Sequence, residues 1–407
     1  MSESKGPLSG VTVIDLTRVL AGPTCTQILG DLGADIIKIE RPVAGDDTRK
    51  FSPPFFKDDK GLDTTESAYF LGANRNKRSV AIDISKPEGA NIIRRMAADA
   101  DALVENFKTG NLAKYDLGYD ELRIQNPKLV YCSVTGFGQT GPYASRPGYD
   151  FLIQGMAGMM SITGDPDGDP QKVGVPIADI MAGMYASVSV NAALRHAAIT
   201  GEGQYIDIGM MDTTVAMLAN VGMNYLHGNM LGRLGNAHPN IVPYQPFKTA
   251  DGYIIVAIGN DSQFERFCEL AGCEDLFCDQ NFSTNDARVR NREMLLPKLD
   301  KIFELRTSKE WLTGLQDKKI GCGPINNLQE VFGDAHVKAR GIVENMDHPM
   351  GGARGVDLIG SPMRFSETPV TYRHAPPLLG QHTDEVLQEK LGLTNEELSG
   401  LRERKVI

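Results

Sequence analysis

The sequence has few of the residues that mark disulfide-rich, metal-binding or nucleic-acid-binding proteins. Its 407 residues include six cysteines and seven histidines, and acidic residues outnumber basic ones by 52 to 42. So few cysteines in so long a chain exclude a disulfide framework and indicate a reducing compartment. The net charge of −10 supplies no basic field, and no run of Lys and Arg marks a groove-reading helix. Nucleic acid is therefore not an expected partner.

Further absences exclude several hydrolase classes. Cys268, Cys273 and Cys278 are spaced five apart, which is not the short pair spacing of zinc sites, and buried thiols explain them better. No His-x-x-x-His pair and no Gly-x-Ser-x-Gly turn occurs in the sequence. We therefore expect no metal site and neither metallohydrolase nor serine hydrolase chemistry.

Long apolar runs are also missing. No stretch approaches the roughly 18 to 20 uninterrupted apolar residues that a spanning helix needs, and the start "MSESKGPLSG" shows neither a secretory apolar core nor an Arg-rich transit pattern. We expect no membrane partner and a cytoplasmic location. The mitochondrial matrix stays open as an alternative if a transit peptide is missing.

The first half of the chain alternates short apolar runs with helical segments. The predicted strands are residues 10–17, 35–40, 78–84, 100–107 and 128–136. This alternation predicts an α/β fold with a doubly wound, mostly parallel, Rossmann-like sheet. Ligands of such sheets bind beyond the carboxyl ends of the strands, so the segments after each strand are the candidates for a site.

After about residue 200 a new segment begins, with predicted strands and turns of its own. Together with the length of the chain, this change predicts two domains. We expect a large α/β domain over residues 1–210 and a linker with a smaller α/β domain over 211–340. Residues 341–407 are expected to return and complete the large domain.

A nucleotide is the expected ligand of the large domain, but its phosphate turn is unusual. The segment "LTRVLAGPTCTQILG" has only Gly22 where a dinucleotide fold needs closely spaced glycines. Arg41 directly follows Glu40 at the end of the second predicted strand, and with Arg18 it suggests a cationic rim. Such a rim suits an adenine nucleotide with extra phosphate, such as coenzyme A, better than NAD. The alternative is that Arg41 is a solvated loop charge.

Asp179 is the one acidic residue of "VGVPIADIMAGMYASVSVNAALRH", residues 173–196. It lies where an extended apolar stretch becomes a long helix, so backbone N–H groups and the helix dipole favour its anionic form. A nucleophilic carboxylate needs that form. An ordinary helix-capping aspartate has the same signature, and the residues alone leave both interpretations open.

Several motifs together resemble a known family. In chain order they are "LSGVTVIDLTRVLAGPTCTQILGDLGADIIKIERP", "NKRSVAIDI", "VENF", "SVTGFGQTGP", "GYD", "TGDPDGDP", "ADIMAGMYA", "TGEGQYIDI" and "PLLGQHTDEVL". The chain resembles the class III coenzyme A transferases over nearly its whole length. Through "NRNKRS", "AGDDTR", "VPYQPFKTADGYI" and "CGPINN" it is most similar to succinyl-CoA:glutarate-type dicarboxylate transferases.

The resemblance implies a homodimer of interlocked subunits that transfers coenzyme A between an acyl-CoA and a free carboxylic acid. Coenzyme A is then a co-substrate, and no permanently bound cofactor is expected. Asp179 matches the family's catalytic aspartate. It is expected to attack the thioester, forming an acyl anhydride and then an aspartyl-CoA thioester. Two alternatives are an acyl-CoA racemase, which would use an Asp/His proton-transfer pair, and a non-catalytic CoA-binding scaffold.

The resemblance also implies further site residues. The predicted coenzyme A contacts are Val19, Ala21, Arg41, Asn106, Phe107, Lys114 in place of a family arginine, Thr135 in place of a lysine, and Gly136. Gly136, Gly138 and Gly259 are candidates for close backbone approach to the substrate, or simple turn glycines.

The acid-binding end is predicted from a departure from the formyl-CoA enzyme. Where that enzyme has a run of glycines, Gly259 is followed here by Asn260-Asp261-Ser262-Gln263, a stiffer and more polar loop that suits a larger acid. Arg18 and Arg146 are the predicted partners of a distal carboxylate, and His238 and Asn260 further candidates. Each is otherwise a solvated or structural residue.

Overall fold

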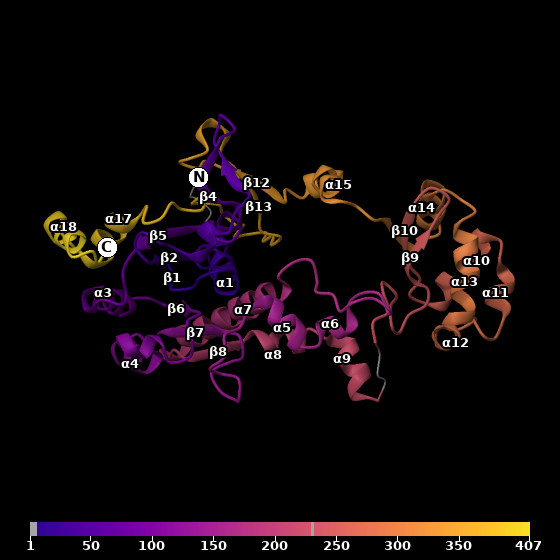
Figure 1. Cartoon of the computed structure of the whole chain (residues 1–407), viewed down its shortest axis with the longest axis horizontal. Coiled ribbons are helices and arrows are strands. Elements are labelled where there is room, and N and C mark those ends of the chain that lie inside the picture. The colour runs from indigo at the N-terminus through magenta and orange to yellow at the C-terminus, as the bar shows by residue number, and fades with distance from the viewer. Residues whose placement is uncertain (1–5, 229–231) are drawn as a thin grey trace. The chain divides into compact units, whose positions relative to one another are not determined.

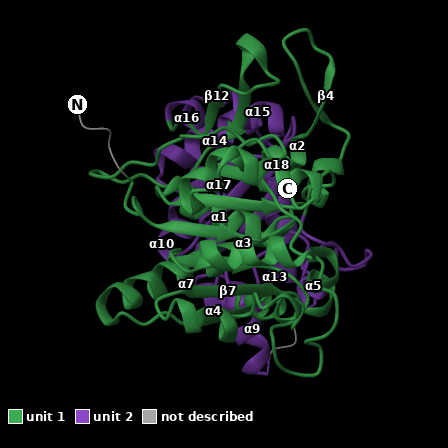
Figure 2. Ribbon diagram, turned by 90° about the vertical axis from the view of Figure 1, so that its left-hand side faces the viewer, with its two compact units in different colours: residues 1–157, 174–217, 340–407 green, residues 158–173, 218–339 purple. Residues whose placement is uncertain are grey.

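The computed structural model describes residues 6–228 and 232–407. These residues form two compact units, coloured green and purple in Figure 2. The first unit contains Met1–Ala157, Gly174–Met217 and Arg340–Ile407, and the second contains Gly158–Val173 and Leu218–Ala339. Residues 158–173, which were expected in the large domain, belong to the second unit.

A six-stranded parallel sheet forms the centre of the first unit (Figure 1). Its strands are β1 (Thr12–Asp15), β2 (Asp35–Glu40), β5 (Lys77–Ala81), β6 (Ala102–Glu105), β7 (Val130–Thr135) and β8 (Tyr205–Gly209). They lie in the order β5-β2-β1-β6-β7-β8, with every neighbouring pair parallel. Counted along the chain this is the 3-2-1-4-5-6 order of doubly wound sheets, which confirms the predicted fold class.

Helices cover both faces of the sheet. The longer helices of this unit are α1 (Ala21–Asp31), α3 (Pro87–Ala97), α4 (Tyr119–Gln125), α5 (Asp150–Met156), α7 (Ile177–Thr200), α8 (Met210–Ala216), α17 (Thr383–Leu391) and α18 (Asn395–Glu403). Val13 and Ile14 of β1 are both fully buried and belong to two different apolar clusters. The cluster of Ile14 includes residues of α3, α17 and α18, and the cluster of Val13 includes residues of α1 and α7. Burial on both faces explains why the strands read as continuous apolar runs.

Smaller elements complete the first unit. They are a 3-10 turn η1 (Asp47–Lys50), a hairpin of β3 (Phe55–Lys57) and β4 (Asp63–Ser67), α2 (Ala68–Leu71), η2 (Leu112–Tyr115), and the pair β12 (Val343–Met346) and β13 (Val356–Ile359) with η3 (Gly352–Arg354) between them. The returning segment is tied to β5 by Arg78, which forms ion pairs with Glu385 at 3.1 Å and Glu389 at 2.6 Å. These ion pairs attach α17 of the returning segment to the edge strand β5 of the sheet.

The long helix α7 packs closely against α1. Gly183 makes this approach possible, because a Cβ atom at this position would lie 2.6 Å from the Ala21 carbonyl oxygen. Among the described residues, α7 is the one helix long and apolar enough to cross a membrane. Its Ala182, Ala186 and Val190 are fully buried within the unit. Part of the helix is thus buried within the unit, while Met184 and Val188 of the same helix are exposed.

The second unit has its own small antiparallel sheet and aromatic core. Its elements are α6 (Met159–Ile162), α9 (Ala219–Leu226), β9 (Tyr244–Lys248), β10 (Tyr253–Ala257), α10 (Asp261–Ala271), α11 (Glu274–Cys278), α12 (Asn285–Arg290), α13 (Arg292–Phe303), α14 (Ser308–Asp317), β11 (Gly321–Pro324), α15 (Leu328–Gly333) and α16 (Ala335–Ala339), with sheet order β11-β10-β9. Phe247 and Phe303 stack at 4.3 Å in the core beside the buried Trp311.

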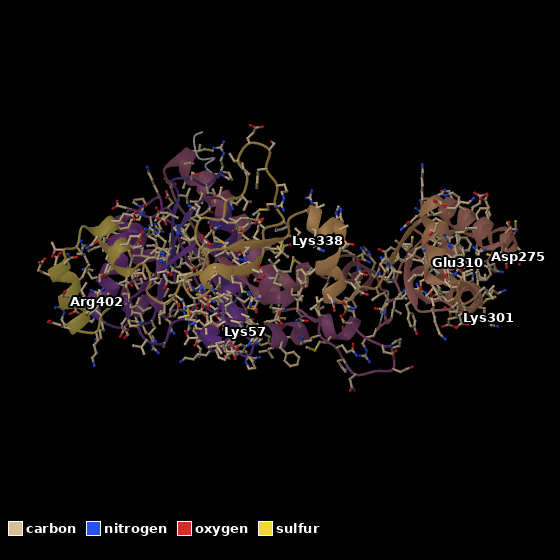
Figure 3. The ribbon with its side chains drawn as sticks, turned by 90° about the horizontal axis from the view of Figure 1, so that it is seen from above. Lys57, Asp275, Lys301, Glu310, Lys338 and Arg402 are labelled. Atoms are coloured by element: carbon tan, nitrogen blue, oxygen red, sulfur yellow. The ribbon has the colours of Figure 1, made fainter. Side chains whose placement is uncertain are left out.

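Charged side chains lie on the outside of both units. Figure 3 shows this for Lys57 and Arg402 of the first unit and for Asp275 and Lys301 of the second. The charged groups of the first unit that are instead buried, discussed below, are therefore unusual.

Candidate active site

The site begins where the strand order reverses, between β1 and β6. The side-chain amide of Asn106, directly after β6, accepts a hydrogen bond from the Arg18 N–H at 2.9 Å and donates one to the Arg18 carbonyl at 2.6 Å. These two bonds hold the loop after β1 against the loop after β6. In doubly wound sheets, this reversal is where ligands bind beyond the strand ends.

A cavity of about 540 Å³ lies beside these two loops, within the first unit. Its volume is in the range of small-molecule sites. Of the residues predicted for the site, the cavity is lined by Arg18, Val19, Ala21, Asn106, Phe107, Thr135, Gly136, Arg146 and Asp179. The fold therefore gathers residues from distant parts of the chain around one carboxylate.

Asp179 lies in the first turn of α7 and is half-buried. It does not cap the helix, because the capping position belongs to Pro176. No hydrogen bond to the Asp179 carboxylate forms within residues 6–228 and 232–407. Both of its oxygens are thus available to a substrate.

The capping role at this helix start belongs to Asp150. One oxygen of its carboxylate accepts the backbone N–H of Ala178 at 2.8 Å, and the other accepts a hydrogen bond from the Gln154 side chain at 2.8 Å. Asp150 itself lies in the first turn of α5 and lines the same cavity as Asp179. Asp150 was not among the residues predicted for the site. The only signal in the sequence was an acid at the start of the helical run "DFLIQGM".

Burial raises the pKa of Asp179 to about 7, and the negative charge of Asp150 adds to the effect. Both causes disfavour the anionic form. An Asp179 anion in this position has lost water without gaining hydrogen-bond donors from the chain. A carboxylate with this pKa is a stronger nucleophile than an ordinary one and still ionises near neutral pH.

A second cavity of about 220 Å³ shares Arg18, Asp47 and Phe107 with the first. Arg41 lines it at the end of β2 and makes no ion pair with the described residues. The Arg18 guanidinium is 3.2 Å from Asp47 and 5.2 Å from the Phe107 ring centre. The predicted cationic rim is therefore partly neutralised at Arg18 and free at Arg41.

Two further cations line the larger cavity. The Arg146 guanidinium lies 3.9 Å from the Tyr143 ring centre and forms no ion pair within the described part of the chain. Lys108, which sequence reasoning missed, also lines this cavity. Arg146 is thus better placed than Arg18 to bind a carboxylate, because the Arg18 charge already has a partner.

The structure explains why residue 136 is a glycine, which the surrounding sequence did not reveal. A Cβ atom at Gly136 would lie 2.4 Å from the Gly148 Cα, so two backbones cross here without space for a side chain. This crossing places the loop before α5, and therefore Asp150, beside the end of β7. Gly138 has a φ of +79°, a conformation that favours glycine. The Thr135 hydroxyl is buried, with no hydrogen-bond partner in the described residues.

The other predicted residues lie elsewhere. Lys114 is exposed in η2 and donates to Asn111 at 3.1 Å. His238, Gly259 and Asn260 belong to the second unit. Asn260 caps α10, accepting the Gln263 N–H at 2.9 Å, so the loop continues directly into a helix.

The polar groups of the larger cavity limit its chemistry. No histidine is present among its lining residues in the first unit, so the Asp/His pair of a racemase is not found there. No group of three His, Cys, Asp or Glu residues in the described chain is arranged to hold a metal ion. The ionisable groups that line the cavity are three carboxylates, one tyrosine and the cations Arg18, Lys108 and Arg146.

The first unit thus combines a Rossmann-like sheet with a switch-point cavity that contains a carboxylate without a hydrogen-bond donor from the described residues. The chain belongs to CoA-transferase family III, whose model matches residues 8–383. The protein is therefore an enzyme that transfers CoA groups.

Individual relatives agree with this family over almost the full length. A succinate–glutarate CoA-transferase of Agrobacterium fabrum is 46% identical, covering 96% of this chain and 97% of that protein. A human succinyl-CoA:glutarate CoA-transferase is 43% identical, covering 95% and 86%. A crystal structure of a CAIB/BAIF family protein from Brucella suis has a TM-score of 0.81 at 45% identity and covers 95% of this chain and all of that one.

Proposed function

We propose that the protein transfers coenzyme A from succinyl-CoA to glutarate, with Asp179 as the nucleophile. The observation that carries this proposal is the Asp179 carboxylate itself, half-buried in the switch-point cavity without a hydrogen-bond donor from the described chain. Relatives at 43% to 46% identity that are named for succinyl-CoA or succinate and glutarate support the choice of substrates.

The proposed reaction has four substitutions at acyl carbon. The Asp179 carboxylate attacks the succinyl thioester carbonyl, the C–S bond breaks, and CoA thiolate leaves a succinyl–aspartyl anhydride. The thiolate attacks the aspartyl carbonyl of the anhydride, forming an aspartyl-CoA thioester and releasing succinate. Glutarate attacks that thioester to give a glutaryl anhydride, and the released thiolate attacks its glutaryl carbonyl. This last step forms glutaryl-CoA and restores the Asp179 carboxylate, so no proton, ATP or metal is consumed.

The two cavities suggest how the donor lies. We place the adenosine end of coenzyme A in the smaller cavity beside Arg41 and the thioester in the larger one beside Asp179. Phe107 lines both cavities, and Val19 and Ala21 line the larger one. An extended ligand that passes Phe107 would thus connect a phosphate-binding cation with the nucleophile.

Arg146 is proposed to bind the distal carboxylate of the acid. Its guanidinium lies 3.9 Å from the Tyr143 ring centre and offers donors without a competing acidic partner in the described residues. A monocarboxylic acid would leave this cation unpaired, which gives the site a preference for dicarboxylates.

We also propose a homodimer. Phe151 of α5 and Val188 of α7 expose 64% and 67% of their surface in the single chain, and Tyr149, Met184 and Tyr185 are also exposed. Exposed apolar side chains on adjacent helices mark an interaction surface, and the resemblance to interlocked dimers makes a second copy the expected partner. Light scattering after size exclusion would show a mass of about twice 44.3 kDa if this is correct.

The deciding experiment is mass spectrometry of the protein incubated with succinyl-CoA and isotopically labelled glutarate. Labelled glutaryl-CoA is expected from the wild type and not from Asp179→Ala. Glu88→Ala is the matched control, because Glu88 is also an acid in the first turn of a helix of the first unit but lines neither cavity. Equal product from Asp179→Ala would overturn the mechanism, and product only with other acids would overturn the choice of glutarate.

A further inference from the structure

The loop that leads from β1 into α1 contains a strained residue at the cavity wall. Val19 has a φ of +68°, in the left-handed region that a β-branched residue rarely adopts. Strained backbone of this kind persists only where the surrounding structure holds it, and it concentrates at functional sites. Val19 lines the cavity of Asp179, and α1 begins two residues later.

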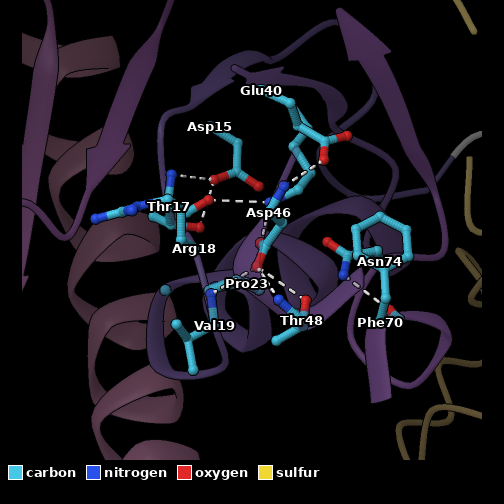
Figure 4. Close-up of polar contacts among 12 residues, drawn as sticks. Asp15, Thr17, Arg18, Val19, Pro23, Glu40, Asp46, Thr48, Phe70 and Asn74 are labelled. Atoms are coloured by element: carbon cyan, nitrogen blue, oxygen red, sulfur yellow. Dashed lines mark hydrogen bonds and ion pairs between the residues drawn. The ribbon is translucent and has the colours of Figure 1, made fainter. Parts of the chain in front are cut away.

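Asp46 is the group that holds Val19. One oxygen of the Asp46 carboxylate accepts the Val19 N–H at 3.2 Å and also accepts the N–H and hydroxyl of Thr48 at 3.0 and 2.8 Å. The other oxygen lies 2.9 Å from the Lys38 ammonium. Figure 4 shows the Asp46 carboxylate between the Val19 backbone and Thr48.

Lys38 holds the same loop two residues earlier. Its ammonium donates to the Thr17 carbonyl at 2.9 Å as well as to Asp46. The carboxylate of Asp15 accepts the Thr17 N–H at 2.8 Å and the Thr17 hydroxyl at 2.5 Å. One ion pair and one carboxylate therefore fix the backbone on both sides of Arg18, whose own N–H and carbonyl are bonded to Asn106.

Both side chains of the Lys38–Asp46 pair are completely buried, as are those of the neighbouring Lys77–Asp15 pair. Burial opposes ionisation of Asp46, but the Lys38 charge and the Thr48 hydrogen bonds bring the pKa of Asp46 down to about 2. The pair is therefore charged at neutral pH. Buried ion pairs often contribute no more stability than apolar side chains of the same volume. The stability of the folded protein therefore does not by itself explain why this position holds an ion pair and not two apolar side chains.

We propose that Asp46, supported by Lys38, is a positioning residue that holds Val19 in its left-handed conformation and so forms the coenzyme A-facing wall of the cavity. The inference rests on the proposed function, since it assumes that coenzyme A passes along Val19. Loss of the Asp46 charge would let the loop relax and weaken coenzyme A binding, while Asp179 and the acid-binding end remain in place.

The test uses Asp46→Asn in the full-length protein, with Asp31→Asn as the matched control. Asp31 forms a comparable buried ion pair with Arg75 at 2.5 Å in the same unit but lines neither cavity. We expect Asp46→Asn to raise the calorimetric Kd for CoA and the KM for succinyl-CoA about tenfold, with the KM for glutarate unchanged. Asp31→Asn is expected to lower thermal stability and leave these constants within about twofold of the wild type.

A double-mutant cycle separates positioning from a general loss of structure. Val19→Gly removes the conformational cost of the positive φ at residue 19. In Val19→Gly, Asp46→Asn should therefore reduce the free energy of CoA binding by at most about half as much as it does in the wild type. Val19→Ala also shortens the side chain of residue 19, but alanine keeps the conformational cost of a positive φ. This variant should therefore not reduce the effect of Asp46→Asn. Additive effects of Asp46→Asn and Val19→Gly would overturn the inference, as would an unchanged Kd for CoA in Asp46→Asn.

Binding and turnover distinguish the failure of this inference from the failure of the proposed function. A wild type that binds CoA but makes no glutaryl-CoA would contradict the proposed function and still allow the Asp46 test by calorimetry. An active wild type whose Asp46→Asn variant keeps its affinity for CoA would contradict the positioning role alone.

Discussion

The carboxylate of Asp150 accepts a hydrogen bond of 2.8 Å from the backbone N–H of Ala178, the residue immediately before Asp179. Asp150 thereby caps α7 in place of a side chain of α7 itself, so the Asp179 carboxylate is left without that task. The same closeness brings a negative charge beside Asp179, the proposed nucleophile, and this charge adds to the effect of burial in raising the pKa of Asp179. One residue thus takes the capping role at this helix start and adds to the effect of burial in raising the pKa of Asp179.

Asp150→Asn should move the pH dependence of the enzyme. The amide oxygen of Asn can still accept the Ala178 N–H, but the negative charge is gone, so the pKa of Asp179 should fall from its value of about 7. The acid limb of kcat/KM against pH reports the free enzyme, and it should move to lower pH in the variant. The measurement is kcat/KM between about pH 5 and pH 9.

Glu105→Gln is the control for this experiment. Burial raises the pKa of Glu105 to about 7 as well, and Glu105 accepts the Phe107 N–H at 2.7 Å beside the proposed coenzyme site. If the acid limb shifts in Glu105→Gln and not in Asp150→Asn, the limb reports the ionisation of Glu105, and the prediction for Asp179 is wrong.

Asp179→Asn should make the protein more stable at pH 8 although it abolishes transfer. The pKa of Asp179 is raised in the folded state, so between about 3.8 and about 7 the folded protein holds a proton that the unfolded chain has released. Stability from this group is therefore present at low pH and is lost as the pH rises through that window. Asn removes the loss, and we expect a gain of about 1 kcal/mol at pH 8 after allowing for solvent screening.

Chemical denaturation at pH 8 and pH 4 measures this difference. The gain should shrink strongly at pH 4, where the wild-type carboxyl is largely protonated in the folded state. An equal gain at both pH values would show that burial of the charge is not its cause.

Gly148→Ala should disrupt the site through the backbone. A Cβ at Gly148 would lie 2.2 Å from the Gly136 Cα, and backbone cannot give way as a flexible side chain does. We expect a loss of at least about 2 kcal/mol in unfolding free energy together with loss of transferase activity. Gly72→Ala is the control, because its φ is −64° and its nearest contact would be an ordinary 3.5 Å. A stable, active Gly148→Ala protein would contradict the crossing of these two loops.

The sheet was largely predictable because its strands are buried on both faces. The predicted strand 35–40 coincides with β2, whereas the predicted strand 10–17 ends at Asp15. The reason is local: Thr17 donates its N–H to the Asp15 side chain and not to a neighbouring strand. Apolar content alone does not reveal that the ladder stops there.

The site was predictable only where one residue carries the signal. Asp179 stood out as a lone acid at a helix start, but its partner Asp150 is 29 positions away on another helix, and no periodicity connects them. The left-handed φ of Val19 is equally invisible, because valine gives no sign of it. Such features depend on which loops the strand order brings together.

Arg146→Ala should reduce the preference for dicarboxylates. Arg18 and Arg146 were equivalent candidates in the sequence, but the Arg18 charge is paired with Asp47 while Arg146 faces the Asp179 cavity without an acidic partner in the described chain. Removing the guanidinium should raise the KM for glutarate at least about tenfold and change the KM for butyrate little, since only glutarate has a second carboxylate to bind. Arg123→Ala is the matched control, because the Arg123 guanidinium also lies over a tyrosine ring, at 5.5 Å from that of Tyr119, but does not line this cavity. If Arg146→Ala keeps the ratio of the two KM values, the distal carboxylate binds elsewhere.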